Sequence, residues 1–216
     1  MDPDLDDLLG RFADPPDTAA GVTGPHRFGE VAAEIEALRA GVYGATAPHL
    51  LVSPAVVGLD RRLRIDERAD HLCAWAADGT LAATLRVTAL PLELPDLSPR
   101  CAELVSALPG HGEISRVVTD PRHRRPEHIT RLFAGMVRAM SHEGATIGVL
   151  GVCRRRVARF YARFGMTPVH DDLLALPGRP DADYLVVAAT YEDMVERGMH
   201  RLLAGTAPRP DVVPTA

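Results

Sequence analysis

Apolar residues recur at helical spacing along two long segments of the chain. In residues 28–42 and 127–143 they fall three and four positions apart, so each segment presents one apolar face. Further helices are expected over residues 100–107, 154–164 and 192–203. Gly144 and Gly165 directly follow two of these segments, at the position where glycine commonly ends a helix.

Shorter apolar runs predict the strands of a sheet. Two of these runs flank Asp78-Gly79, a dipeptide that favours a tight hairpin turn, and another ends at Asp120-Pro121. The expected strands cover residues 71–77, 80–89, 113–119, 146–152 and 184–190. Helices and strands in this order predict an α/β (α+β) fold, in which a mixed central sheet carries helices on both faces.

The two ends of the chain differ in composition from its middle. Residues 1–25 are rich in Asp, Pro and Gly and are expected to form a mobile arm or lid, while the Pro-rich residues 205–216 are expected to be a disordered tail. No linker interrupts residues 26–204. A chain of 216 residues with 46% hydrophobic residues can bury one sizeable core, so we expect a single domain over 26–204.

Composition narrows the possible chemistry. All 24 residues counted as Lys or Arg are arginine. The chain therefore lacks the lysine of a Schiff-base or pyridoxal-phosphate enzyme and the lysine of a phosphate-loop nucleotide triphosphatase. The net charge of −5 disfavours a general nucleic-acid binder. The three cysteines lie far apart without zinc-ligand spacing, so neither a metal site nor a disulfide framework is expected.

Membrane and export signals are also missing from the pattern. No apolar run approaches the roughly 20 residues of a membrane helix. The first residues are acidic where a secretory signal would be basic. We expect a cytoplasmic protein without a membrane partner.

Two stretches, Thr119 to Ile129 and Gly151 to Thr167, resemble signature regions of GNAT acyltransferases. The first matches a strand that leads through an arginine-containing loop into a helix. The second matches a helix that carries an alanine and a tyrosine and closes on a glycine-containing pair. The matching residues there are Ala158, Tyr161, Gly165 and Met166.

A narrower resemblance joins several motifs between roughly residue 60 and residue 170. The chain is similar to acyl-homoserine-lactone (autoinducer) synthases and N-acyl amino acid synthases. Those families have an acidic pair before a strand, an Asp and a Gly at a hairpin, an Arg late in the next strand, and then Glu-x-Ser-Arg. The matching residues are Asp66, Asp70, Asp78, Gly79, Arg86, Glu113, Ser115 and Arg116.

One departure from the GNAT pattern bears on the acyl donor. Arg124 keeps the arginine of the phosphate loop, but Arg125 and Glu127 replace its two glycines. Glycine there lets backbone N–H groups approach a pyrophosphate closely, so the replacements argue against tight binding of CoA. The autoinducer-synthase resemblance implies instead a phosphopantetheine thioester on acyl carrier protein, with CoA as the other donor and no permanently bound cofactor.

Amide formation needs a base, an oxyanion site and an acid. Glu113 is the candidate base, acting directly or through water, or else a structural carboxylate paired with Arg116 or Arg86. Backbone N–H groups at Val117 and Val118, in a strand bulge, are the expected oxyanion donors. The resemblance assigns protonation of the leaving thiolate to Tyr161; the alternative is a core aromatic residue.

Arginines provide the candidate binding groups. Arg86 and Arg116, beside Ser115, would hold an acceptor carboxylate or the pair Asp66 and Asp70, unless they are exposed on an edge. Donor phosphates are expected at basic clusters that follow two strands and share one surface, with a solvated charge run as the alternative. These clusters comprise Arg122, His123, Arg124 and Arg125, and Arg154, Arg155 and Arg156.

Three hypotheses follow for function. The first is an N-acyltransferase that moves an acyl group from a carrier thioester to the amine of a small molecule or amino acid. The second uses aminoacyl-tRNA as the donor, and the third is a non-catalytic GNAT-like binding module.

A Cys153–His123 acyl-enzyme is an alternative to a buried, inert Cys153 thiol. Both a monomer and a homodimer are compatible with the sequence.

Overall fold

The computed structural model describes residues 22–89, 91–123, 126–143, 146–177 and 179–199. Within them an eight-stranded sheet has the order β1-β2-β3-β4-β5-β8-β6, with β7 paired to β8. Its strands are β1 (Val22–His26), β2 (Asp70–Trp75), β3 (Leu81–Thr88), β4 (His111–Thr119), β5 (Gly148–Arg154), β6 (Thr167–Pro168), β7 (Leu174–Leu176) and β8 (Arg179–Thr190). The pairing of β4 with β5 is parallel and the other recorded pairings are antiparallel, so the sheet is mixed.

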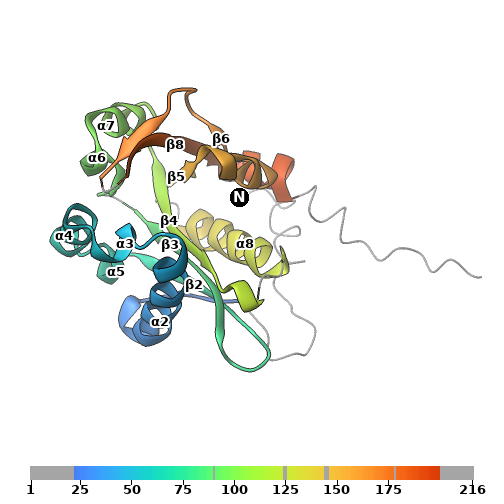
Figure 1. Cartoon of the computed structure of the whole chain (residues 1–216). Coiled ribbons are helices and arrows are strands. Elements are labelled where there is room, and N and C mark those ends of the chain that lie inside the picture. The colour runs from blue at the N-terminus through green and yellow to red at the C-terminus, as the bar shows by residue number, and fades with distance from the viewer. Residues whose placement is uncertain (1–21, 90, 124–125, 144–145, 178, 200–216) are drawn as a thin grey trace, which may run out of the picture.

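Helices cover both faces of this sheet (Figure 1). One face is covered by α8 (Pro126–Glu143), whose apolar stripe packs on β2, β3 and β5 in the largest core cluster. The other face carries two separate groups of helices. The first group is α2 (Phe28–Thr46), α3 (His49–Val52), α4 (Pro54–Leu63) and α5 (Ile65–Arg68), and the second is α6 (Leu94–Leu97) and α7 (Pro99–Ser106).

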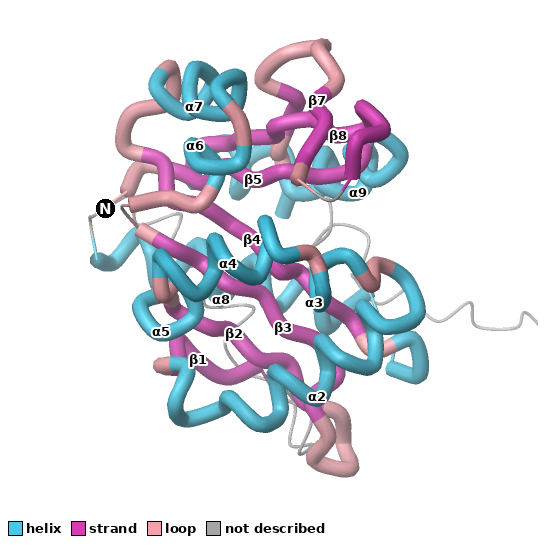
Figure 2. The backbone as a smooth tube through the Cα atoms, turned by 60° about the vertical axis from the view of Figure 1, so that its left-hand side comes forward, coloured by secondary structure: helices cyan, strands magenta, loops and turns pink. Residues whose placement is uncertain are grey.

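The two groups lie over different halves of the sheet, each with its own core cluster. Helix α2 packs its buried Val31, Ile35 and Leu38 against Cys73 and Val118. Helices α6 and α7 pack over β5 and β8. Figure 2 shows β1 to β3 in its lower half and β5, β7 and β8 in its upper half, with β4 between them. The space between the helix groups therefore lies over β4 and β5.

Most elements expected from the apolar pattern are confirmed. The Asp78-Gly79 hairpin joins β2 and β3, and the helices expected near residues 28–42, 100–107 and 127–143 are α2, α7 and α8. The mixed sheet with helices on both faces confirms the fold class. Among the described residues, no helix combines the length and apolar character needed to cross a bilayer.

Other boundaries differ from the expectation. Residues 22–25 of the expected arm belong to β1, which pairs with β2 at the edge of the sheet. A Gly-Pro dipeptide is tolerated in an edge strand. Residues 1–21 and the expected tail lie outside the described residues. Helices α3 to α5 stand where we expected no helix. The helix expected over 154–164 is broken into η2 (Arg155–Val157), α9 (Ala158–Tyr161) and η3 (Ala162–Phe164). The final helix divides into α10 (Tyr191–Asp193) and η4 (Met194–Met199).

Candidate active site

The parallel strands β4 and β5 separate in the middle of the sheet. Their register pairs are His111 with Gly148, Gly112 with Val149, and Glu113 with Leu150, and no later pair is recorded. Both strands continue beyond this point, β4 to Thr119 and β5 to Arg154. The two strands therefore enclose a gap that begins at Glu113.

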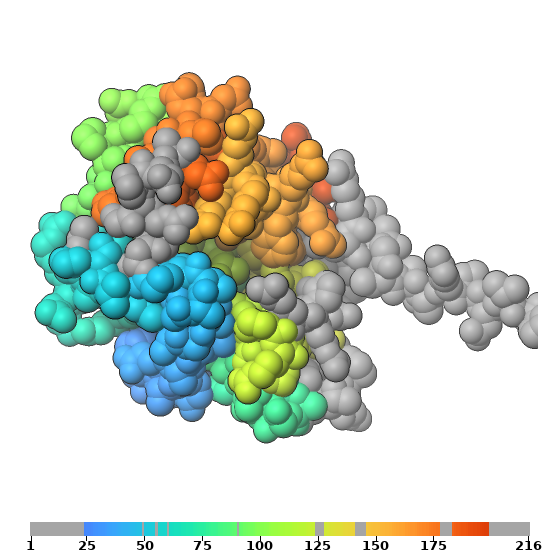
Figure 3. Space-filling view, in the orientation of Figure 1, coloured from blue at the N-terminus to red at the C-terminus, as the bar shows by residue number. Residues whose placement is uncertain are grey.

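A cavity of about 860 Å³ occupies this gap. Its walls come from β4, β5 and α9, from α6, from the end of β7 and from Tyr184 of β8. The end of α2 and the segment that joins it to α4 complete them. Figure 3 shows this face hollowed between α2, in blue, and the amber segment around residues 150–165. Both the expected base Glu113 and the expected acid Tyr161 line the cavity, together with Ser115, Arg116, Val117 and Val118.

A β-bulge interrupts β4 beside the cavity. Between β3 and β4 the register runs from Thr84 with Val118 to Arg86 with Ser115, so β4 contains one residue more than β3 there. Arg116 occupies the bulge with φ of 51°, a left-handed conformation that costs a residue with a side chain roughly 1–2 kcal/mol. The bulge expected near Val117 and Val118 is thus present, one residue earlier. It leaves local N–H groups out of the regular ladder.

The Glu113 carboxylate is 1% exposed at the start of the gap. Its Oε2 accepts hydrogen bonds from the backbone N–H groups of Glu93, at 2.6 Å, and Leu94, at 3.0 Å. Burial, and then the charge of Glu93, raise the pKa of Glu113 to about 7. The Glu113 carboxylate thus anchors the start of α6, and its pKa lies near neutral pH, the range suited to a general base.

Arg86 lies buried behind the cavity wall and connects other parts of the fold by hydrogen bonds. Its guanidinium is fully buried and donates to Asp66, at 3.0 Å, to Glu93, at 2.5 Å, and to the Ser115 hydroxyl, at 2.9 Å. Arg86 does not line the cavity. Of the two roles expected for Arg86, the structure shows the pairing with Asp66 and not a fork open to an acceptor carboxylate, because a buried guanidinium in the sheet interior is compensated by the protein's own carboxylates.

Asp66 and Asp70 also lie outside the cavity lining. Asp66 joins α5 to α2 and β3, since it accepts from Arg39 at 2.7 Å as well as from Arg86. Burial favours protonation of Asp66, but these two arginines more than offset it and lower its pKa to about 2. Asp70 pairs with Arg27 at 3.1 Å. Both aspartates, expected to bind substrate, instead connect the N-terminal helices to the sheet.

Tyr161 projects from α9 into the cavity wall. Its ring packs edge-on against Phe133, with ring centroids 6.2 Å apart, and against Phe160, 5.4 Å apart. Burial, with smaller contributions from Cys153 and Tyr43, raises the pKa of Tyr161. Tyr161 is therefore compatible with both interpretations. Its ring packs in the core, as a core aromatic residue does, and the residue also lines the cavity, as an acid must.

Cys153 and His123 are not brought together as a nucleophile and its base. Burial raises the pKa of the Cys153 thiol to about 11, although Cys153 lines the cavity. His123 lies instead at the β2–β3 hairpin, where its ring contacts the Thr80 hydroxyl at 3.3 Å. Among the described residues, no group of His, Cys, Asp and Glu side chains is arranged to hold a metal ion.

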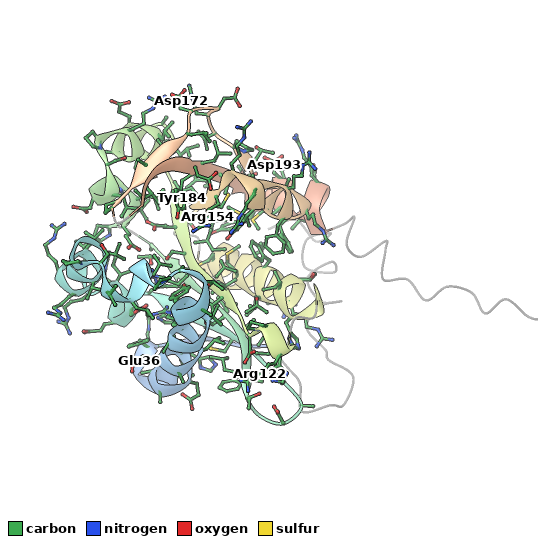
Figure 4. All side chains as sticks on the ribbon, in the orientation of Figure 1. Glu36, Arg122, Arg154, Asp172, Tyr184 and Asp193 are labelled. Atoms are coloured by element: carbon green, nitrogen blue, oxygen red, sulfur yellow. The ribbon has the colours of Figure 1, made fainter. Side chains whose placement is uncertain are left out.

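The described residues of the two basic clusters lie at different places: Arg122 and His123 lie at the β2–β3 hairpin, whereas Arg154 and Arg156 lie at the cavity. Arg154 and Arg156 line the cavity, and Arg155 on the same segment is exposed. Arg122 pairs with Asp120 at 2.7 Å and lies beside the β2–β3 hairpin, apart from Arg154 in Figure 4. The divergence of β4 and β5 separates the ends of the two strands. Arg124 and Arg125 lie outside the described residues.

Glu93 and Tyr43 are among the cavity residues that the sequence analysis did not single out. Glu93 lies in the Pro-rich connection before α6, and Tyr43 lies near the end of α2. Glu93 is only 6% exposed, which is unusual for a glutamate unless it is paired. A glutamate between apolar residues in "PLELP" was the available signal, because a charge in such a run needs a partner.

No protein-family model and no curated protein matches this chain. Solved structures do match it. FeeM, an N-acyl amino acid synthase from uncultured soil microbes, aligns with a TM-score of 0.64 at 12% identity over 87% of this chain and 100% of its own. An acyl-CoA N-acyltransferase from Pseudomonas aeruginosa aligns with a TM-score of 0.52 at 19% identity over 80% and 100%.

A putative acetyltransferase of the GNAT family from Desulfovibrio desulfuricans gives a TM-score of 0.54 at 16% identity, over 80% of this chain and 99% of its own. These identities are low, while the alignments cover nearly the whole of each solved chain. The chain therefore has the GNAT fold, with β4 and β5 diverging around its central cavity.

Proposed function

We propose that this protein is an N-acyltransferase that moves an acyl group from a phosphopantetheine thioester to the amine of a small molecule or amino acid. The observation that carries the proposal is the cavity between β4 and β5, because Glu113, Tyr161 and the Arg116 bulge all line it. The fold shared with acyltransferases supports the reaction class.

The transfer is a direct attack of the amine on the thioester. Glu113 takes a proton from the acceptor ammonium, and the free amine then adds to the thioester carbonyl. Backbone N–H groups at Val117 and Val118 stabilise the oxyanion of the tetrahedral intermediate. The intermediate gives its nitrogen proton to water and collapses: the C–S bond breaks, the amide forms, and Tyr161 gives its proton to the departing thiolate. Glu113 then releases its proton to water and Tyr161 takes one from water, which restores both side chains.

The proton affinities of the cavity residues support these roles. With a pKa of about 7, Glu113 is partly ionised at neutral pH and holds an abstracted proton well. Tyr161 carries its proton at neutral pH, since burial raises its pKa further above the ordinary value of 10.0, so a proton is present there to donate. The thiol of Cys153, with a pKa of about 11, stays protonated, which favours direct transfer over an acyl-enzyme.

Arginines of β5 and η2 support a donor that carries phosphate. Arg154 and Arg156 line the cavity, and Arg154 pairs in register with Tyr184. Figure 4 shows these two labelled residues close to each other. Arg155, Arg159 and Arg163 are exposed on the same segment, which contains no acidic residue from 154 to 170. We propose acyl carrier protein as the donor, with CoA as the second source of the same phosphopantetheine arm.

The test is a search for the amide product. The full-length chain is incubated with a panel of amino acids and amines and with acyl-CoA, acyl carrier protein thioesters or aminoacyl-tRNA, and products are identified by mass spectrometry. An amide from a thioester donor, lost in Glu113→Gln and reduced in Tyr161→Phe, supports the proposal. Amide formation from aminoacyl-tRNA alone, or none from any donor, contradicts it.

A further inference from the structure

Glu93 is a second carboxylate in the wall of the cavity. It stands directly before α6, and its side chain is 8% exposed. The motifs that identified Glu113 and Arg116 do not include it. Its position places a buried negative charge beside the candidate base.

The Glu93 carboxylate contacts two arginines on different strands. Its Oε2 accepts from Arg86 of β3 at 2.5 Å, and its Oε1 lies 3.7 Å from Nη2 of Arg116 in the β4 bulge. Arg86 is fixed in turn by Asp66 and Ser115. Glu93 therefore links a buried, fixed guanidinium to one that lines the cavity.

The backbone of Glu93 reaches the base itself. Its N–H donates to Oε2 of Glu113 at 2.6 Å, and the next N–H, of Leu94, donates to the same atom at 3.0 Å. These two bonds orient the Glu113 carboxylate. The side chain and backbone of one residue thus act on Arg116 and on Glu113 together.

We propose that Glu93 is a positioning residue of the acyl-transfer site, which holds Arg116 at the cavity wall and fixes Glu113 in the orientation from which it accepts the proton of the amine. The inference rests on the proposed function. The charge of Glu93 has a second effect, because a neighbouring negative charge makes ionisation of Glu113 less favourable. The charge of Glu93 therefore raises the pH at which Glu113 ionises and becomes active as the base.

Glu93→Gln tests this through the pH dependence of kcat/KM. Glutamine keeps the backbone donor and a hydrogen-bond acceptor but removes the charge. Activity rises as Glu113 loses its proton, so the rise moves to lower pH by on the order of one unit when the like charge is gone. One unit below the wild-type midpoint, the variant retains about fivefold more of its own maximal activity than the wild type does.

A loss of structure alone gives a different result. A purely structural Glu93 lowers activity equally at every pH and leaves the midpoint unchanged, which overturns the proposal. Glu103→Gln is the matched control, since Glu103 is exposed on α7 and pairs with Arg100 at 2.7 Å; it leaves the profile unchanged. If Glu93→Gln does not fold, Glu93→Asp is the second variant, because its shorter side chain moves the charge away by one methylene. It shifts the midpoint in the same direction by less. An unchanged midpoint in Glu93→Asp overturns the proposal.

A titration without substrate separates this inference from the proposed function. The side-chain carboxyl carbon of Glu113 is followed by ¹³C NMR and assigned by its absence in Glu113→Gln. The midpoint falls in Glu93→Gln if Glu93 acts on Glu113, whether or not an acyl donor has been found. An unchanged midpoint contradicts the role of Glu93 even in an active enzyme.

Discussion

Glu113 and Leu150 form the last register pair between the parallel strands β4 and β5. The candidate base is thus placed where the sheet stops closing and the cavity starts. On its other side, Glu113 anchors the first residues of α6. A single residue therefore joins the sheet, the α6 wall and the proposed chemistry.

Gly151 follows this pair, and its replacement tests the packing of the two strands. A Cβ atom at Gly151 would meet the carbonyl oxygen of Ile114 at 2.7 Å. We expect Gly151→Ala to lower the free energy of unfolding by about 1–3 kcal/mol, as overpacking does. Denaturant unfolding measures it. Gly41→Ala is the control, because a Cβ on this α2 glycine meets nothing within 4 Å; an equal loss there would contradict the explanation.

Removal of the base is expected to abolish most of the activity without unfolding the chain. Glu113→Gln lowers kcat by about 10²- to 10⁴-fold, the usual contribution of a general base. Its amide oxygen still accepts the N–H groups of Glu93 and Leu94. Steady-state kinetics give the loss, and circular dichroism checks the fold. Retained activity in the folded variant would show that Glu113 is only an anchor.

The pH dependence of the wild-type enzyme follows from the same residue. The carboxylate form is the base, so kcat/KM rises with pH through a midpoint near the Glu113 pKa of about 7. The measurement is a profile of kcat/KM between pH 5 and pH 9, which extends roughly two pH units to either side of that pKa. A midpoint near the ordinary glutamate value would assign the base role to another group.

Stability should depend on Asp66 at the acid end of the pH range. The folded pKa of about 2 lies below the ordinary value of 3.8, so the carboxylate stabilises the fold above that ordinary value and loses this effect as pH falls toward 2. Asp66→Asn removes the charge opposite Arg39 and Arg86 and is expected to cost about 3 kcal/mol at neutral pH. Thermal unfolding at pH 7 and at pH 3 measures the difference, which should shrink at the lower pH. A constant difference would refute the role.

Donor binding should separate the two arginine clusters. Arg154→Ala and Arg156→Ala each raise the donor KM by about tenfold, because each removes a charged hydrogen-bond donor from the cavity wall. Arg122→Ala leaves it unchanged, since Arg122 pairs with Asp120 at the hairpin. Equal effects of Arg122→Ala and Arg154→Ala would instead support the single phosphate-binding surface expected from the sequence.

Regular apolar patterns made much of the fold predictable. The stripe of α8, the Asp78-Gly79 hairpin and the strand that became β4 could be read directly, because helix and strand periodicities differ. The edge strand β1 could not, since it is short and contains Gly24 and Pro25. The helix expected over 154–164 is broken because its packing around the cavity overrides the local pattern.

The site was predictable only where motifs marked it. Glu113, Arg116 and Tyr161 carry such motifs, and all three line the cavity. The partners of Arg86 depend on contacts between residues far apart in the chain, as its hydrogen bonds to Asp66 and Ser115 show. Glu93 lies in a connection without periodicity, so its partners Arg86 and Arg116 could be found only in three dimensions.

The central claim is that acyl transfer takes place in the cavity between β4 and β5. Val152→Trp places a large ring in that cavity from the β5 wall, and its effect on amide formation tests the claim most directly. The account predicts that a variant with the melting temperature of the wild type forms no detectable amide from a donor that the wild type uses. Amide formation at the wild-type rate by this folded variant would contradict it.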